Sequence, residues 1–240
     1  MGDGGFGAKI MFTVSENVPL IGGLPITETI TTTWIIMAIL ILGSIILTKN
    51  LKRIPSGMQN TIELLVNTVY KLTEETMGND KVGFAPYIGT LMMYLAVANL
   101  IGLLGIRPPT ADLNMTLALA LITFFMIHFN GIRKKGIFGY LKGFTEPFIL
   151  LTPINLIGEI ATPISLSFRL FGNIVGGSII MALVYAALAS FSTALLGIDI
   201  PILQVGVPAV LHVYFDVFSG LLQTFIFAML TMVFVSGAMD

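Results

Sequence analysis

The sequence contains no cysteine and only two histidines among its 240 residues. The lack of cysteine excludes a disulfide framework, thiol catalysis and cysteine-ligated metal sites. Two histidines alone make a structural zinc site unlikely on ligand number, so we expect no metal and no cofactor. The nucleotide-binding pattern GxxxxGK[ST] and the metalloprotease pattern HExxH are also missing. The residues therefore indicate no hydrolytic chemistry.

Charged residues are scarce as well. They make up 10% of the chain, against about 25% in a typical soluble domain. Hydrophobic residues make up 55%, and the mean hydropathy is +0.94. This composition predicts a membrane protein in contact with lipid. The net charge of −1 and the lack of a basic stripe with interleaved aromatic residues argue against nucleic-acid binding.

The chain shows no Ser/Gly/Pro-rich linker, no block of like charges and no convincing internal repeat. We therefore expect one membrane domain over residues 1–240. The missing repeat weighs against the repeat-built secondary transporters. Residues 1–28 have no basic segment followed by an apolar core, so they predict a polar tail and not a cleaved signal.

The spacing of ionisable residues predicts the membrane spans. Uncharged runs over 29–48, 82–106 and 113–132 are each long enough to cross a hydrocarbon core of about 30 Å as a helix. Two longer stretches follow: 136–190, which comprises a loop and a long helical arm, and 202–239. The predicted fold class is therefore all-α integral membrane, with about five crossings.

The last two stretches are too long to stand upright in a membrane. The apolar run 147–190 would be roughly 66 Å long as one helix, and 202–239 roughly 57 Å. Both must tilt strongly, kink or break. Because proline disrupts helix interiors, we expect bends at Pro153, Pro163 and Pro208.

Basic residues orient the chain. Nine of the twelve follow the first or the third span: Lys49, Lys52, Arg53, Lys71, Lys81, Arg133, Lys134, Lys135 and Lys142. The positive-inside rule makes both loops cytoplasmic. Five crossings then place the N-terminus outside and the C-terminus inside. We expect a multi-pass protein of a bacterial plasma membrane.

Residues 55–78 lie between the first two spans and show helical amphipathicity. Ile62, Leu65, Val66, Val69 and Leu72 recur at helical spacing. This pattern fits a helix lying on the inner membrane surface. It fits a cytoplasmic helix packed on a partner equally well.

Arg169 is the charge that most needs an explanation, because it lies far from either end of its apolar run. A charge at the centre of a membrane helix costs about 2.5–3.5 kcal/mol on insertion scales, so it normally has a function or a partner. Asn173 lies one turn on, followed by Gly176 and Gly177, which favour close approach of another helix. The competing interpretation is a permanent structural pair with Glu159 or Asp216.

The last helix carries a polar stripe. His212, Asp216, Ser219 and Gln223 are spaced 4, 3 and 4 residues apart and so share a face. If Arg169 and Gln223 are level, His212, Asp216 and Ser178 form an outer polar path to the arginine. Asn155, Glu159 and Thr162 could line a separate inner path. Two half-paths that meet at one cation would suit ion transfer.

These segments together resemble subunit a of the F-type ATP synthase. PISLSFRLFGNIVGG resembles the family segment around its essential arginine, which maps to Arg169, with Asn173 as the following asparagine. LLQTFIFAMLTMVFVS resembles the last-helix motif and places its glutamine at Gln223. PPTADLNMTLALAL resembles the outer-loop segment, including Asp112 and Asn114. The likeness runs from the first span to the C-terminus.

The resemblance implies a mechanism and partners. A non-catalytic stator subunit would carry protons, or sodium ions, through two offset half-channels to and from a carboxylate on the rotating c-ring. The last two crossings would form a tilted hairpin beside that ring, with Arg169 facing it. The peripheral-stalk subunit b, the rest of the ATP synthase and membrane lipid would be the other partners. Some family members have an acid at the position of Ser178 and a histidine at that of Asp216. Here the acid is on the last helix instead, so we expect the same outer-channel function with its polar groups exchanged between the two facing helices.

Two other functions compete with this one. A stand-alone secondary transporter could use Arg169 to hold an anionic substrate, but it would need a pocket at the membrane midplane. A purely structural scaffold would not explain polar residues on matching sides of two long helices.

Overall fold

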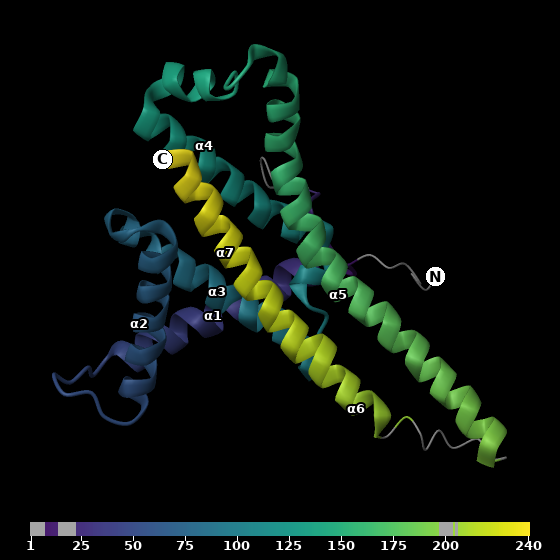
Figure 1. The fold of residues 1–240 in the computed structure, drawn as a ribbon. Helices are drawn as coiled ribbons and strands as arrows, with labels where there is room; N and C mark the ends of the chain where they lie inside the picture. Colours follow the sequence, from purple (N-terminus) through teal and green to yellow (C-terminus); the bar gives the residue numbers. More distant parts are fainter. Residues whose placement is uncertain (1–7, 14–22, 197–203, 205) are drawn as a thin grey trace.

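The computed structural model describes residues 8–13, 23–196, 204 and 206–240 (Figure 1). Within these ranges the chain is almost entirely helical. The α-helices are α1 (Glu28–Thr48), α2 (Met58–Met77), α3 (Ala85–Leu100), α4 (Leu113–Gly143), α5 (Thr152–Leu196), α6 (Val207–His212) and α7 (Ser219–Met239). Short 3-10 turns are η1 (Asn79–Phe84), η2 (Ile101–Leu104), η3 (Pro109–Ala111) and η4 (Ile149–Leu151), and η6 (Val213–Phe218) is a π-helical turn.

The fold is that of an all-α integral membrane protein. Among the described residues, five helical segments are long and apolar enough to cross a membrane: Glu28–Thr48, Asn79–Leu104, Leu113–Gly143, Ile149–Ala194 and Pro208–Met239. The amphipathic helix α2 is not one of them. Helices suit a bilayer because they pair backbone N–H and C=O groups within one segment.

The packed core centres on α3. One cluster of buried side chains joins α3 to α1, α4, α5 and α7 and includes Leu95 and Leu170. A second joins α3 to α2, α4 and α7 and includes Ile88 and Met232. Asn99, near the end of α3, is also buried: its amide donates to the Gly220 carbonyl at 2.9 Å, and its oxygen accepts from Thr110 at 2.8 Å. These bonds fix α7 against α3.

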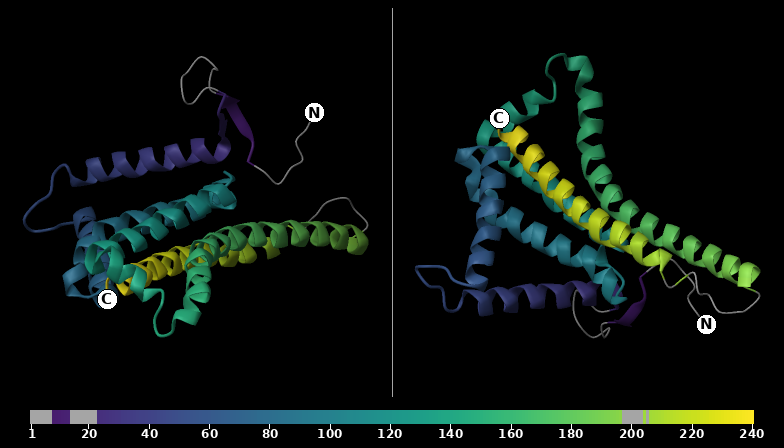
Figure 2. Two further views of the ribbon diagram at one scale, coloured as in Figure 1. Left: turned by 90° about the horizontal axis from the view of Figure 1, so that it is seen from above. Right: turned by 60° about the horizontal axis from the view of Figure 1, so that its bottom comes forward.

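Helix α5 and the continuous run α6–η6–α7 lie side by side and antiparallel, as a long hairpin (Figures 1 and 2). The 45 residues of α5 amount to roughly 68 Å. Pro163 lies inside α5, which changes direction in its N-terminal half in Figure 1. The predicted bends at Pro153 and Pro208 are wrong: each proline lies in the first turn of a helix, where a missing N–H breaks no helical bond.

Helix α4 contains a sharp kink that the sequence did not predict. Gly136 has φ 74° and ψ 161°, a backbone conformation that glycine adopts without strain. The last turns of α4, residues 137–143, therefore leave the direction of the first part. They end close to the start of α5, at the end of the molecule where the C-terminus lies (Figure 2).

The first helices lie at the periphery. Only Thr29, Thr32 and Ile36 of α1 are buried. The C-terminal half of α2 packs on the chain's own helices, whereas apolar side chains of its N-terminal half, such as Leu65, are exposed. Before α1, the expected polar tail contains a short antiparallel ribbon of β1 (Ile10–Thr13) and β2 (Pro25–Thr27).

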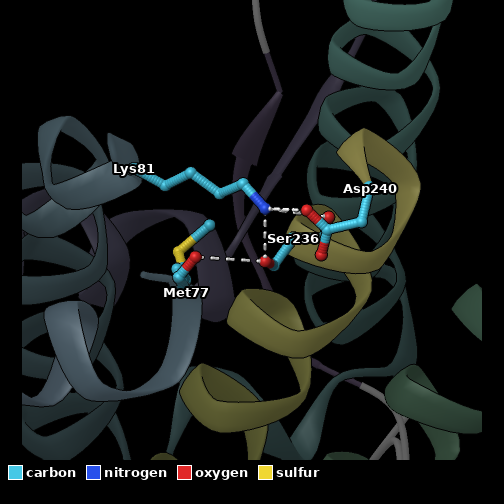
Figure 3. Close-up of polar contacts among 4 residues, drawn as sticks. All are labelled: Met77, Lys81, Ser236 and Asp240. Carbon is cyan, nitrogen blue, oxygen red and sulfur yellow. Dashed lines mark hydrogen bonds and ion pairs between the residues drawn. The ribbon is translucent and has the colours of Figure 1, made fainter. Parts of the chain in front are cut away.

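A buried lysine ties the end of α7 to the start of the second span (Figure 3). The Lys81 side chain is only 9% exposed. Its ammonium donates to the Ser236 hydroxyl at 2.9 Å and forms an ion pair with Asp240, while the Ser236 hydroxyl donates to the Met77 carbonyl at 3.4 Å. The aliphatic stem of Lys81 is buried and its charge is compensated, as a lysine at this depth requires.

Candidate functional site

Arg169 lies on the face of α5 that points away from the protein core. Its side chain is exposed, although its neighbours Leu166 and Leu170 are 2% and 1% exposed. Within the described ranges no hydrogen bond or ion pair reaches the guanidinium. The interpretation of a permanent pair with Glu159 or Asp216 is therefore wrong. The Arg169 guanidinium is thus free of side-chain partners in the part of the chain that the structure describes.

Asn173 links α5 to α7. The Ser219 hydroxyl donates to the Asn173 side-chain oxygen at 2.7 Å. Because the two helices are antiparallel, one turn back along α5 leads to Arg169 and one turn forward along α7 leads to Gln223, about 6 Å in the same direction. This register brings Gln223 and Arg169 to the same level. The Asn173 amide nitrogen is buried and has no hydrogen-bond partner among the residues that the structure describes.

A cavity of about 470 Å³ opens beside the hairpin on one side of this level. We call it the α5–α6 cavity. Its polar lining comprises Asn99, Arg107, Asn173, Ser178, Tyr185, His212 and Asp216. The cavity therefore brings together Ser178, His212 and Asp216, the three residues that sequence reasoning assigned to one path, and it reaches Asn173, one turn from Arg169.

Three of these side chains form a hydrogen-bonded chain. The Tyr185 hydroxyl lies 3.1 Å from Nε2 of His212, and Nδ1 of His212 lies 2.5 Å from an Asp216 carboxylate oxygen. Asp216 lies within the π-helical turn η6, which widens the helix locally. A neutral imidazole has one donor and one acceptor nitrogen, so this chain can pass a proton along its length.

A larger cavity of about 900 Å³ lies on the opposite side, between the end of α4, the start of α5 and the end of α7. We call it the α4–α5 cavity. It contains Asn155, Glu159 and Thr162, the residues assigned to the second path, together with Lys135, Tyr140 and Glu146. The Asn155 amide donates to the Phe144 carbonyl at 2.9 Å, which fixes the connection between α4 and α5.

A smaller pocket of about 200 Å³ continues this cavity toward the arginine. It is lined by Arg169 and Ser165 and shares Gly158, Thr162 and Phe234 with the α4–α5 cavity. Arg169 thus lies where this hollow ends, and the α5–α6 cavity begins one turn further along α5. The two cavities lie on opposite sides of one cation.

The other predicted residues take different places. Asp112 caps α4 by accepting from the Asn114 backbone N–H at 3.0 Å, and it also accepts from the Thr29 hydroxyl at 2.8 Å. Neither Asp112 nor Asn114 lines the cavities described above. Gln223 is half-buried and also lies outside them. In the described ranges no group of three or more histidine and acidic side chains could hold a metal ion.

Sequence reasoning missed Arg107, Tyr140 and Tyr185. The two tyrosines fall within apolar runs and follow no polar periodicity, so only the tertiary fold shows that they line cavities. Arg107 falls in the loop between the second and third predicted spans. Counting tyrosine hydroxyls among the polar groups of the spans would have identified Tyr140 and Tyr185.

Residues 30–236 match the family described as ATP synthase A chain. The chain belongs to this family. Among curated relatives, the ATP synthase subunit a of Propionigenium modestum, described as sodium ion specific, is 37% identical over 97% of this chain and 85% of its own length. Subunit a 2 of Bradyrhizobium sp. (strain BTAi1) is 38% identical over 91% of both chains, and subunit a of Geobacter sulfurreducens is 38% identical over 89% and 88%.

Membership of the ATP synthase A chain family assigns the chain to the membrane sector of the ATP synthase. It supports an ion-translocating stator role, with the rest of the ATP synthase complex as the partner. Nothing in these comparisons supports a stand-alone secondary transporter.

Proposed function

We propose that the two cavities are the half-channels of a subunit a, and that they carry protons to and from a carboxylate on the c-ring. The observation that carries this proposal is Arg169: exposed, without a partner in the described chain, and located between two cavities that open on opposite sides. An isolated cation in a membrane span is unfavourable unless a partner supplies the counter-charge. A ring carboxylate that moves past α5 would supply it.

The α5–α6 cavity is the outer half-channel in this proposal. A proton that arrives at Tyr185 binds Nε2 of His212, while the proton on Nδ1 passes to Asp216. Asp216 releases it to the cavity water that reaches Asn173 and the ring. Ser178, which lines the same cavity, adds a hydroxyl to this route.

The α4–α5 cavity is the inner half-channel. Glu159, Asn155 and Thr162 would receive the proton that leaves the ring and release it at the opening near Lys135 and Glu146. Arg169 would have two effects. Its charge favours the ionised form of the ring carboxylate, and it repels protons that would otherwise pass straight from one half-channel to the other.

The orientation that we propose follows the positive-inside rule. The loops rich in lysine and arginine are cytoplasmic, so the N-terminus is outside and the C-terminus inside a bacterial plasma membrane. The hairpin of α5 and α6–η6–α7 lies beside the c-ring. The exposed apolar faces of α1 and α2 are available to the peripheral-stalk subunit b and to lipid.

The decisive test is R169A in the assembled ATP synthase, reconstituted in vesicles with an imposed ion gradient. We expect ATP synthesis to be lost while the c-ring still co-purifies, because the counter-charge and the barrier both disappear. Tightly coupled synthesis in R169A would refute the role. The same vesicles driven by a sodium gradient at constant pH test the ion: synthesis under that condition would replace protons with sodium.

A further inference from the structure

Tyr140 is held in an unusual position by two glycines of α4. The kink at Gly136 turns the end of the helix so that the Tyr140 ring lies back over the preceding turns. A Cβ at Gly131 would lie 2.5 Å from the Tyr140 ring, so only glycine fits beneath it. The same Cβ would approach the Ala238 carbonyl of α7 at 3.3 Å. Residue 131 must therefore be small for the ring to be seated here.

His128 makes the second contact with this tyrosine. Its Nδ1 lies 3.4 Å from the Tyr140 hydroxyl, and the two rings have centroids 5.8 Å apart. His128 in turn packs on Phe124, with centroids 3.9 Å apart, and is half-buried. The proposed half-channels do not use His128. Its contact orients the hydroxyl of a side chain that borders a cavity.

Tyr140 lines the α4–α5 cavity together with Asn155 and Glu159. The Glu159 carboxylate and the Tyr140 hydroxyl therefore belong to residues that line one cavity. The lining also includes the charged side chains of Lys135 and Glu146. Tyr140 thus borders a cavity that holds an acid one turn from the Arg169 pocket and further charged groups at the end of α4 and in the loop after it.

We infer that Tyr140 is a proton-relaying residue of the α4–α5 half-channel and that His128 is its positioning residue. This inference rests on the proposed function. A phenol can accept and donate a hydrogen bond at once. In the relay, a new O–H bond forms on Tyr140 as a proton arrives from the Glu159 side, and the original O–H bond breaks to release its proton to water on the opening side. The ring keeps no net charge.

A structural alternative is that the Tyr140 ring only fills space over Gly131. Y140F distinguishes the two, because it keeps the ring and removes the O–H. The assay uses membrane vesicles with the assembled complex, from which the catalytic head is then stripped, and measures passive proton flow per co-purified c-ring. We expect Y140F to lower the flow about fivefold, the effect of one lost hydrogen bond. Y70F, at an exposed tyrosine of α2, is the matched control, and its proton flow should equal that of the unmodified complex.

Flow in Y140F equal to that of the unmodified complex would overturn the relay. H128L tests the positioning role: it should lower the flow less than Y140F, and the double variant should match Y140F alone. Additive losses would show that His128 does not act through Tyr140. Coupled ATP synthesis by R169A, measured in vesicles that retain the catalytic head, separates failure of this inference from failure of the proposed function. If R169A abolishes synthesis and Y140F changes nothing, this inference fails and the proposed function stands.

Discussion

The Ser219 hydroxyl and the Asn173 side-chain oxygen form a 2.7 Å hydrogen bond that sets the register of the long hairpin. This single polar contact lies one turn from both Arg169 and Gln223. Phe215, one turn earlier on the same side, would meet a Cβ at Gly177 at 3.5 Å, so the two helices pack closely here. The contact between Tyr185 and His212 is a second polar link across the hairpin, further from the arginine.

S219A should weaken this register. The substitution removes the only hydrogen bond that the Asn173 side chain makes within the described ranges, so both its oxygen and its nitrogen are left unpaired there. Hydrogen bonds between membrane helices contribute about 0.6 kcal/mol on average and up to about 1.7. We expect a loss of stability of this size and a lower ratio of protons pumped to ATP hydrolysed. S190A, which removes an exposed bond within α5, is the control and should change neither quantity.

D216N should slow proton uptake through the α5–α6 cavity. An amide can still bond to His212 but cannot receive and release the proton. The rate of ATP synthesis at a fixed gradient should fall at least severalfold, with normal amounts of co-purified c-ring. D80N, at an exposed acid of η1, should behave like the unmodified complex. An unchanged rate in D216N would reduce Asp216 to a structural partner of His212.

K81M should lower the thermal stability of the chain by several degrees. The methionine fits the stem of the buried lysine but leaves the Ser236 hydroxyl and the Asp240 carboxylate without their donor (Figure 3). D240N should have a smaller effect, because Asp240 is exposed and water can replace the lysine. Thermal unfolding in mild detergent measures both. An equal melting temperature in K81M would contradict a stabilising role for this contact.

The same contact predicts an acid dependence. The hydrogen bond from Lys81, with the nearby charges of Lys81, Lys135 and Lys134, lowers the pKa of the Asp240 carboxyl below its ordinary value of 3.8. A lowered pKa contributes stability that is present above the ordinary value and is lost as the pH falls through the lowered one. Between pH 4 and strongly acidic pH, the melting temperature of D240N should therefore fall less than that of the unmodified chain. The difference should be the contribution of a single titrating carboxyl. E74Q, at an exposed acid of α2, should retain the normal dependence.

Amine labelling tests the orientation. An impermeant reagent applied to intact cells should modify Lys9 and leave Lys134 unmodified, and opening the cells should expose Lys134. The reason is the excess of basic residues in the loops after the first and third spans. The reverse pattern would overturn the assignment of inner and outer cavities, although both cavities would remain.

The sequence was informative where charge is rare. In a chain with 10% charged residues, each membrane-embedded polar group stands out, so Arg169, Asn173, His212 and Asp216 could be identified as a group. The same scarcity marked the apolar segments, which supported the all-α membrane fold. Helical periodicity then correctly brought His212 and Asp216 into contact.

Features that depend on local backbone geometry were not predictable. The kink at Gly136 and the π-helical turn that carries Asp216 have no distinct sequence pattern, since glycine and aromatic residues occur throughout the spans. Pro153 and Pro208 were misread because a proline disrupts a helix interior but fits its first turn. Tyr140 and Tyr185 were not identified because tyrosine counts as a hydrophobic residue in the sequence pattern. Only the fold shows that they line cavities.

The exposed guanidinium of Arg169 also bears on how the complex is built. A chain that inserts before it meets its partner holds a cation against lipid, at about 2.5–3.5 kcal/mol on insertion scales. In the proposed function, docking to an acidic ring would remove this penalty. The unassembled subunit would then be the less stable species, and one side chain would make its stability depend on assembly.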